Sequence, residues 1–200
     1  MISNPHAPEK PWRVFCAVEL PLDLRERMMD HVHELRSSIP NARASWNRIE
    51  NLHLTVKFLG NVDTRRVDDI LAAALQAAMS VAPFEIKVGG CGSFSQRGSP
   101  RVLWTGIDDL ESGMKRLYQA LEDAMEAIGF ARESRPFHAH ITIARIRVGD
   151  DNARRLAERH RELPFSPAVV KVNSLAVIRS ILGTEGSRYI TLADHKLGSN

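Results

Sequence analysis

The sequence predicts an α+β fold built from two pseudo-symmetric lobes, in which antiparallel sheets with outer helices surround a central cleft. Three observations support this prediction. Segments with the two-residue alternation of strands are interleaved with segments that have the 3.6-residue period of helices. That order, β-α-β-α-β, occurs twice, and a His-x-Thr tripeptide recurs at the matching place in each half. We therefore interpret residues 1–200 as a single bilobal domain whose pattern repeats over about 12–107 and 101–193.

The first half of the chain begins with an apolar strand and an amphipathic helix. The helix places one apolar residue on the same stripe at each turn, from Leu24 to Ile39. Apolar and polar residues then alternate around His53, as in a half-buried strand, while the glycines and serines over 89–99 predict a loop. The expected elements are a strand over 13–20, a helix over 22–39, a strand over 51–60, a helix over 64–79 and strands over 83–88 and 101–107.

The second half repeats this pattern with an offset of 87 residues, which superposes His53 on His140 and Thr55 on Thr142. Its first helix should end at Gly129, because glycine favours the left-handed conformation that terminates helices. The expected elements are a helix over 109–128, a strand over 138–148, a helix over 151–162 and strands over 168–178 and 187–192, the last two joined by a turn over 183–186.

Composition is that of an ordinary soluble globular protein, with 44% hydrophobic and 26% charged residues among 200. No run of about 18 apolar residues could span a membrane, and residues 1–6 lack the apolar stretch of a signal peptide. Cys16 and Cys91 have no CxxC spacing, so neither a disulfide framework nor a zinc site is indicated, and both are expected to be buried thiols. We expect a cytoplasmic monomer.

Charge is concentrated in one region. Residues 132–161 contain eight arginines against four acidic residues, although the net charge of the whole chain is only +3. Such a cluster suits an anionic partner, for example a phosphate ester or RNA, and a solvated helix face is the alternative interpretation.

The His-x-Thr tripeptides are the strongest candidates for a reaction site. On a strand, His53 and Thr55 point to one face and Leu54 to the other. Two imidazoles with an unperturbed pKa of about 6.5, facing each other across a cleft, could transfer protons in an in-line attack on phosphorus without a metal. Threonine hydroxyls could donate to the phosphate oxygens. A single such histidine would more often simply cap a sheet, but the repetition in register favours catalysis.

These motifs identify a family resemblance. The segments HLTVKFLG from His53 and RPFHAHITIAR from Arg135 resemble the paired motifs of the two-histidine (2H) phosphoesterases, specifically the LigT-like RNA 2′,3′-cyclic phosphodiesterases. The resemblance implies hydrolysis of a 2′,3′-cyclic phosphate to a 2′-phosphomonoester, without a metal or other cofactor, and in some members a reverse 2′-5′ joining of RNA ends. It also implies that His53 is the general acid, that His140 is the general base, and that the partner is RNA or a nucleotide carrying the cyclic phosphate.

Four further residues are candidates for substrate binding. Arg145 ends the second family motif and could hold the phosphate, although strand parity directs it away from the His140 face unless a bulge re-aims it; an exposed strand arginine is the alternative. Phe15 and Phe58 match aromatic positions near the family's cleft, and by alternation Phe58 also fits the core. Trp46 could stack on a base or pack within its loop.

One departure from the family pattern leaves other functions open. Ala139 stands where the family usually has proline before the second motif histidine, and His138 shares a face with His140. His-x-His can chelate a metal, although no carboxylate stands at a matching short spacing. The alternatives are therefore an RNA- or nucleotide-binding module without significant turnover, and a metal-dependent hydrolase built on these two histidines.

Overall fold

The computed structural model describes residues 10–184 and 186–198, so residues 1–6 and Glu185 of the expected turn lie outside the described part. Nine strands, four α-helices and two 3-10 turns follow one another there. In chain order they are β1 (Trp12–Glu19), α1 (Leu22–Ser38), β2 (Ala44–Trp46), η1 (Ile49–Asn51), β3 (His53–Val62), η2 (Thr64–Arg66), α2 (Val67–Met79), β4 (Phe84–Gln96), β5 (Ser99–Asp108), α3 (Gly113–Ala127), β6 (His140–Ile146), α4 (Asp151–Glu162), β7 (Ala168–Val172), β8 (Ser174–Gly183) and β9 (Gly186–Lys196).

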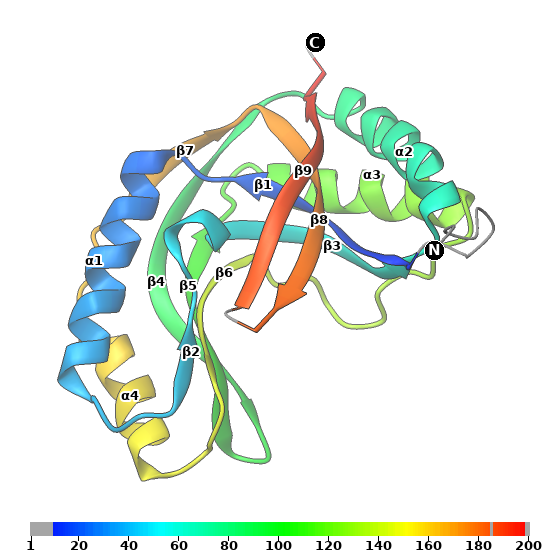
Figure 1. The fold of residues 1–200 in the computed structure, drawn as a ribbon. Coiled ribbons are helices and arrows are strands. Elements are labelled where there is room, and N and C mark those ends of the chain that lie inside the picture. Colours follow the sequence, from blue (N-terminus) through cyan, green and yellow to red (C-terminus); the bar gives the residue numbers. More distant parts are fainter. Residues whose placement is uncertain (1–9, 185, 199–200) are drawn as a thin grey trace, which may run out of the picture.

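All of these strands join one antiparallel sheet, in the order β7-β4-β5-β6-β3-β1-β8-β9, and β2 pairs with β6. The sheet is strongly curled, and the helices lie outside the curve: α1 and α4 beside β4 and β5, α2 and α3 beside the other half (Figure 1). The predicted α+β class with an antiparallel sheet and outer helices is therefore confirmed. None of the helices in the described ranges is long and apolar enough to cross a membrane.

The two halves meet at the centre of the sheet. β3 and β6 run antiparallel, and their register brings Leu54 opposite Ile141. Both of these side chains are completely buried on the helix-covered side, with 0% exposure. Because side chains alternate along a strand, the histidine and threonine that flank each of them point to the other, concave side. The repeated motifs thus lie on neighbouring strands of one continuous sheet.

Several elements differ from the sequence-based expectations. β4 continues to Gln96 through the expected loop, because Gly90, at φ +71°, lies where the register with β5 shifts and so accommodates a bulge. α3 begins at Gly113, four residues after the expected start at Asp109. Asp109 precedes the helix, and its carboxylate accepts from the first-turn amides of Met114 and Lys115, both at 3.1 Å. β2 was not expected.

The predicted strand over 168–178 is two strands, which pair in different places. β7 is an edge strand beside β4, whereas β8 lies between β1 and β9 near the other edge. Only Asn173 separates them, and one residue advances the chain by about 3.8 Å. The sheet must therefore curl until its distant parts meet at this corner, which Figure 1 shows where β7 crosses into β8.

Candidate active site

A cleft of about 1000 Å³ occupies the concave side of the sheet and is lined by residues from both halves. Its lining includes all four side chains of the repeated motifs, His53 and Thr55 from β3 and His140 and Thr142 from β6. The structure therefore brings together in one cleft the two imidazoles and two hydroxyls that the sequence singled out.

The two imidazoles are held in the same way. His53 Nδ1 donates to the backbone oxygen of Asn51 at 2.9 Å, and His140 Nδ1 donates to the backbone oxygen of His138 at 2.7 Å. In each half the acceptor is the carbonyl two residues before the histidine. This bond places the proton of a neutral imidazole on Nδ1, which leaves the Nε2 lone pair free to take a proton.

His53 is enclosed by aromatic rings. Phe15 stacks on its ring at 4.8 Å between centroids, and Tyr189 meets it edge-on at 5.3 Å. Its Nε2 lies 3.0 Å from Thr55 Oγ1, whose hydroxyl can donate to it. Burial lowers the pKa of His53 to about 4; the hydrogen bond to Asn51 opposes this shift, and the positive charges of Arg145 and His140 add to it.

His140 lies in a more open environment. The edge of Phe94 approaches its ring at 4.8 Å, and the His138 ring lies 6.3 Å away. Burial again lowers the pKa of His140, the hydrogen bond to the His138 carbonyl opposes the shift, and the charges of His138 and Arg145 lower it further. His138 itself is exposed and packs edge-on against Phe94 and Trp104, at 5.3 and 5.1 Å.

Arg145 lines the cleft, where the sequence required a bulge to place it. The register of β6 with β5 pairs Ala144 with Leu103 but Thr142 with Trp104, so Ile143 is an extra residue. Ile143 and Ala144 are consecutive and both fully buried, which reverses the alternation. As a result Arg145 is exposed on the cleft side, and its charge acts on both histidines and on Tyr189.

A second bulge explains the positions of Phe58 and Lys57. The register of β3 with β1 pairs Thr55 with Ala17 and Lys57 with Cys16, so Val56 is the extra residue. The interpretation of Phe58 as a core residue was wrong: it is 50% exposed and lines the cleft, with the Arg13 guanidinium 4.8 Å from its ring centroid. The alternation of apolar and polar residues around His53 would also put Lys57 on the face of His53 and Thr55, but Lys57 is buried instead. Phe15 is also in the cleft lining, but it is only 3% exposed.

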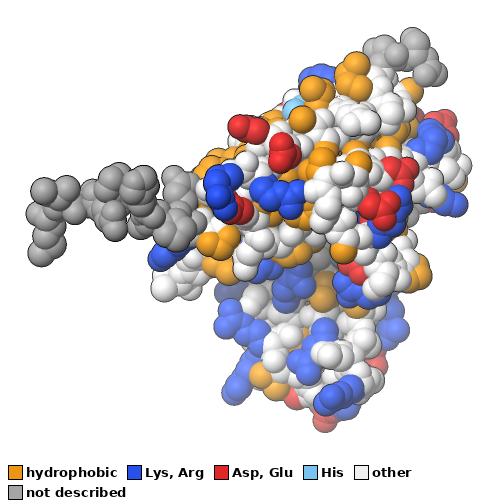
Figure 2. Space-filling model, turned by 90° about the vertical axis from the view of Figure 1, so that its right-hand side faces the viewer, with side chains coloured by type: hydrophobic (Ala, Val, Ile, Leu, Met, Phe, Trp, Pro, Cys, Tyr) orange, Lys and Arg blue, Asp and Glu red, His pale blue; other side chains and the backbone are white. Residues whose placement is uncertain are grey.

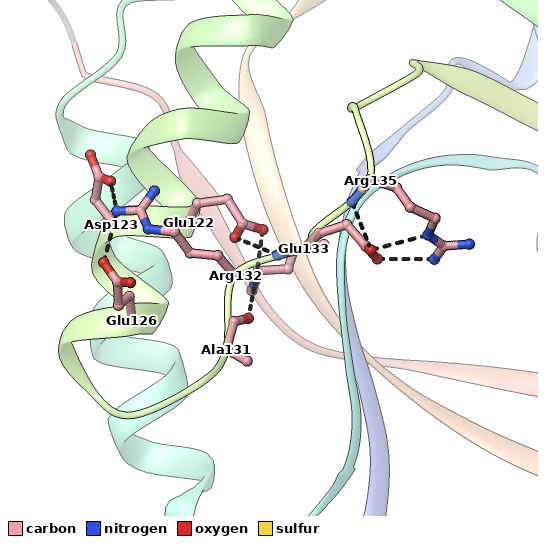
Figure 3. Close-up of polar contacts among 8 residues, drawn as sticks. Glu122, Asp123, Glu126, Ala131, Arg132, Glu133 and Arg135 are labelled. Carbon is pink, nitrogen blue, oxygen red and sulfur yellow. Dashed lines mark hydrogen bonds and ion pairs between the residues drawn. The ribbon is translucent and has the colours of Figure 1, made fainter.

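Lys57 helps to hold the loop that leads to His140. Its Nζ lies 2.6 Å from Glu122 Oε1 on α3 and donates to the Ala131 carbonyl at 3.1 Å, while Glu122 Oε2 accepts from the Glu133 amide at 3.1 Å. Figure 3 shows Glu122 directed at the loop. Because both charges of the pair are buried, with 5% and 3% exposure, the pair fixes the loop backbone with little screening.

The same loop contributes arginines to the cleft. Arg132 contacts Asp123 and Glu126, and Arg135 forms a two-pronged pair with Glu133 at 3.0 Å (Figure 3). Both arginines line the cleft, as does Arg13. Figure 2 shows Lys and Arg side chains gathered in a hollow of the molecule and below it. This distribution favours an anionic ligand.

Trp46 is the one predicted site residue that the structure places elsewhere. It lies on β2, opposite Ala144, and lines a second cavity of about 420 Å³ that also includes Met29 and Val32 of α1. Its ring packs against the hydrophobic core. The strand pairing of β2, which the sequence did not indicate, turns this side chain away from the histidines.

Several cleft residues were not identified as site residues from the sequence. Tyr189 and Phe94 frame the two imidazoles, and Asn47 donates to the Thr142 carbonyl at 2.7 Å, which anchors β6 from the neighbouring segment. A signal was present for the two aromatic residues, because the stretches over 90–94 and 180–189 also resemble the family, in addition to the two His-x-Thr segments. Asn47 carries no such signal, because the contact depends on β2.

The family model described as the 2′-5′ RNA ligase superfamily matches residues 21–184. The chain belongs to this superfamily. The match covers both His-x-Thr motifs and confirms the resemblance to the 2H phosphoesterases.

Relatives within the superfamily align over most of their length. A Thermotoga maritima protein named RNA 2′,3′-cyclic phosphodiesterase is 30% identical over 180 residues, covering 90% of this chain and 92% of the relative. A Methanothermobacter thermautotrophicus protein of the same name is 31% identical over 191 residues, covering 92% and 98%.

Two solved structures share the fold. A Thermus thermophilus protein superposes with a TM-score of 0.73 and 27% identity, over 94% of this chain and 98% of that one. Escherichia coli LigT, crystallised with 3′-AMP, superposes with a TM-score of 0.71 and 24% identity over the same shares. The latter likeness supports the fold alone.

Proposed function

We propose that this protein is an RNA 2′,3′-cyclic phosphodiesterase that opens the cyclic phosphate by acid-base catalysis with two histidines. One observation carries the proposal: each imidazole is anchored at Nδ1 by the carbonyl two residues earlier, which frees Nε2 in a cleft that also holds Arg145. The names of relatives at about 30% identity support the choice of substrate.

The chemistry requires one neutral and one protonated imidazole. The neutral imidazole takes a proton from water through Nε2, and the water oxygen forms a bond to phosphorus. The bond from phosphorus to the 3′ oxygen breaks on the opposite side, and that oxygen takes a proton from Nε2 of the other imidazole. The products are a 2′-phosphomonoester and a 3′ hydroxyl. Thr55, Thr142 and Arg145 would donate to the non-bridging oxygens as their negative charge increases.

We assign the acid role to His53 and the base role to His140, following the superfamily analogy. An acid must carry a proton before the step, whereas burial holds the pKa of free His53 at about 4. An anionic phosphate near Nε2 favours the imidazolium and raises this pKa. His53 would then be protonated chiefly when substrate is bound, and His140, facing the more open side, would activate water.

The same groups could also join RNA ends. If the 5′ hydroxyl of a second RNA takes the place of water, its oxygen forms the bond to phosphorus while the bond to the 3′ oxygen breaks. The neutral imidazole takes the proton of the 5′ hydroxyl, the other imidazole protonates the 3′ oxygen, and the product is a 2′-5′ phosphodiester. We therefore include reverse 2′-5′ ligation in the proposal as a minor activity. Because one chain supplies both histidines and both threonines, we infer that a monomer is sufficient.

The proposal is tested with a 2′,3′-cyclic mononucleotide as substrate. His53→Ala and His140→Ala should each lower kcat by about 10²–10⁴, the usual contribution of a general acid or base. The wild-type product should be the 2′-phosphate isomer, identified by ³¹P NMR. His33→Ala is the control, because His33 is an exposed histidine on α1.

Two outcomes would contradict the proposal. Wild-type turnover in both cleft variants would remove the histidines from the reaction, and binding of the cyclic nucleotide without hydrolysis would favour a binding module. Loss of activity in EDTA, restored by added metal, would favour the hydrolase built on His138 and His140.

A further inference from the structure

A second group of reactive side chains lies on the opposite side of the sheet from the cleft. His31 of α1, His160 of α4 and Cys91 of β4 converge where these two helices cover the strands. His31 Nε2 lies 3.0 Å from His160 Nδ1 and 3.8 Å from Cys91 Sγ, and all three atoms lie within 4.8 Å of one another. The proposed phosphodiesterase reaction uses none of them.

The orientation of His160 directs a lone pair into this cluster. His160 is 0% exposed, and its Nε2 donates to the Trp104 carbonyl at 3.0 Å. In the neutral ring the proton therefore resides on Nε2, so Nδ1 faces His31 and Cys91 unprotonated. A carbonyl in this position is the usual outer partner of a metal-bound histidine, because it fixes both tautomer and ring angle. On the other histidine, Phe165 packs edge-on against the His31 ring at 5.6 Å and restrains the position of that ring.

Two of the three separations among these atoms are close to those of metal ligands. With bonds of about 2.0–2.1 Å to nitrogen and 2.3 Å to sulfur, tetrahedral Zn²⁺ places two nitrogens about 3.3 Å apart and a nitrogen and a sulfur about 3.6 Å apart. The two distances to His31 Nε2, 3.0 and 3.8 Å, deviate from these by a few tenths of an ångström. The third pair, His160 Nδ1 and Cys91 Sγ, lies within 4.8 Å, so coordination requires the half-buried Cys91 thiol to move toward His160.

We propose that His31, Cys91 and His160 bind one borderline-soft divalent ion, Zn²⁺ by preference, with a water molecule as fourth ligand. Two imidazoles and one thiolate are a donor set that selects zinc-like ions over Mg²⁺ or Ca²⁺. Cys91 is only half-buried, which leaves a side of the site open to solvent for entry of the ion and for the water.

Proton balance is simple. Burial lowers the pKa of His31 and lowers that of His160 to about 4, so both rings are neutral near pH 7, and His31 needs only to move its proton to Nδ1. Burial raises the pKa of Cys91 to about 11, so the thiol is protonated until the ion binds. Binding therefore releases one proton per ion. Arg159 lies near His31, but its charge is paired with Glu34 at 3.1 Å.

The ion would act as a structural clip. It would join α1 and α4 to β4 by bonds that form only when all three elements are in place. A ligand that binds the native state alone stabilises that state, and a concentration of 100 times Kd raises the Tm of a chain of this length by about 5–10 °C.

Titration of the full, tag-free chain with Co²⁺, a spectroscopic substitute for Zn²⁺, tests the proposal. One Co²⁺ per chain should bind with release of one proton, giving visible bands of four-coordinate cobalt and a near-ultraviolet thiolate-to-cobalt band. Zn²⁺ should then displace the cobalt without further proton release. Cys91→Ser should lose the thiolate band and raise Kd at least about tenfold. It should not change the hydrolysis rate, because Cys91 faces away from the cleft.

Matched variants keep the test decisive. Cys16→Ala removes the other cysteine and His33→Ala removes an exposed histidine of the same helix, and both should bind Co²⁺ like the wild type. The proposal is overturned if no ion binds, if Cys91→Ser leaves the spectrum unchanged, or if Cys16→Ala abolishes the thiolate band. Because the readout is a spectrum, failure of the proposed hydrolase activity would leave this result unaffected.

Discussion

The two His-x-Thr strands have the same backbone arrangement but different surroundings. In both, Nδ1 is anchored to the carbonyl two residues earlier. His53, however, is stacked under Phe15 and bonded to Thr55, whereas His140 meets only the edge of Phe94 and stands beside an exposed His138. Repetition of a motif therefore determines how each imidazole points, while the surrounding side chains determine how readily it takes a proton.

The approaches to the two strands also differ. β3 follows the short turn η1 directly, whereas a loop over 128–139 precedes β6 and is held by the buried pair of Lys57 and Glu122. Since Lys57 belongs to β3, the first half of the molecule supports the entry to the second. The position of the loop before His140 therefore depends on a residue of the strand that carries His53.

The largest expected effect comes from breaking that pair. Lys57→Met leaves the Glu122 charge buried and unpaired, which should lower the free energy of unfolding by about 3–5 kcal/mol. Urea denaturation measures the loss. The double variant Lys57→Met with Glu122→Leu removes both charges and should recover most of it; a single variant as stable as the wild type would show that the pair does not hold the loop.

Arg145 tests what the two strands share. Because its charge acts on both histidines, Arg145→Met should raise the pKa of each and lower kcat/KM by about 10²–10³ through loss of a phosphate donor. Arg145→Lys keeps the positive charge but not the forked guanidinium, so its kcat/KM should lie between those of the wild type and Arg145→Met. A pKa change at only one histidine would contradict the shared role.

Acid should destabilise the fold through His53. Its folded-state pKa of about 4 lies below the unfolded value of about 6.5, so the unfolded chain takes up the proton first as the pH falls. The stabilisation is complete above about pH 6.5 and is lost as the pH falls toward 4, by up to about 3 kcal/mol. Urea titrations of the wild type and of His53→Gln at several pH values measure this effect: the stability of the wild type relative to the variant should fall by up to about 3 kcal/mol as the pH falls from 6.5 toward 4.

The smallest effect separates the two aromatic environments. Phe15→Leu should expose His53 and raise its pKa by about one unit, equivalent to about 1.4 kcal/mol, without changing that of His140. Phe94→Leu should do the reverse. Proton NMR titration of the imidazole resonances measures the pKa of both histidines in each variant. A variant that shifts the two pKa values equally would contradict the separate aromatic environments.

Sequence periodicity predicted most of the fold, because apolar residues recur every two residues in a half-buried strand and every three to four residues in a half-buried helix. It predicted the stripe on α1 and the burial of Leu54 and Ile141. It could not predict the consequences of the bulges at Val56 and Ile143, since a single extra residue reverses the parity of everything that follows. Lys57 and Phe58 exchanged their expected faces for that reason.

Contacts between distant segments were the other limit. Trp46 lies outside the expected site because β2 pairs with β6. A strand of three residues is too short to show a recognisable alternation in the sequence. The cluster of His31, Cys91 and His160 joins three segments, each of which contributes one residue without any recognisable spacing. Both cysteines were expected to be buried thiols, but Cys91 is only half-buried, and the packing of α1 and α4 gives it two histidine neighbours.

The corner at Asn173 has a consequence for folding. A chain that passes in a single step from one edge of the sheet to a strand near the other edge can complete that step only after the intervening strands have assembled. Such long-range closure makes folding slow and cooperative. We expect one unfolding transition for the whole chain, and no separately stable fragment from either half.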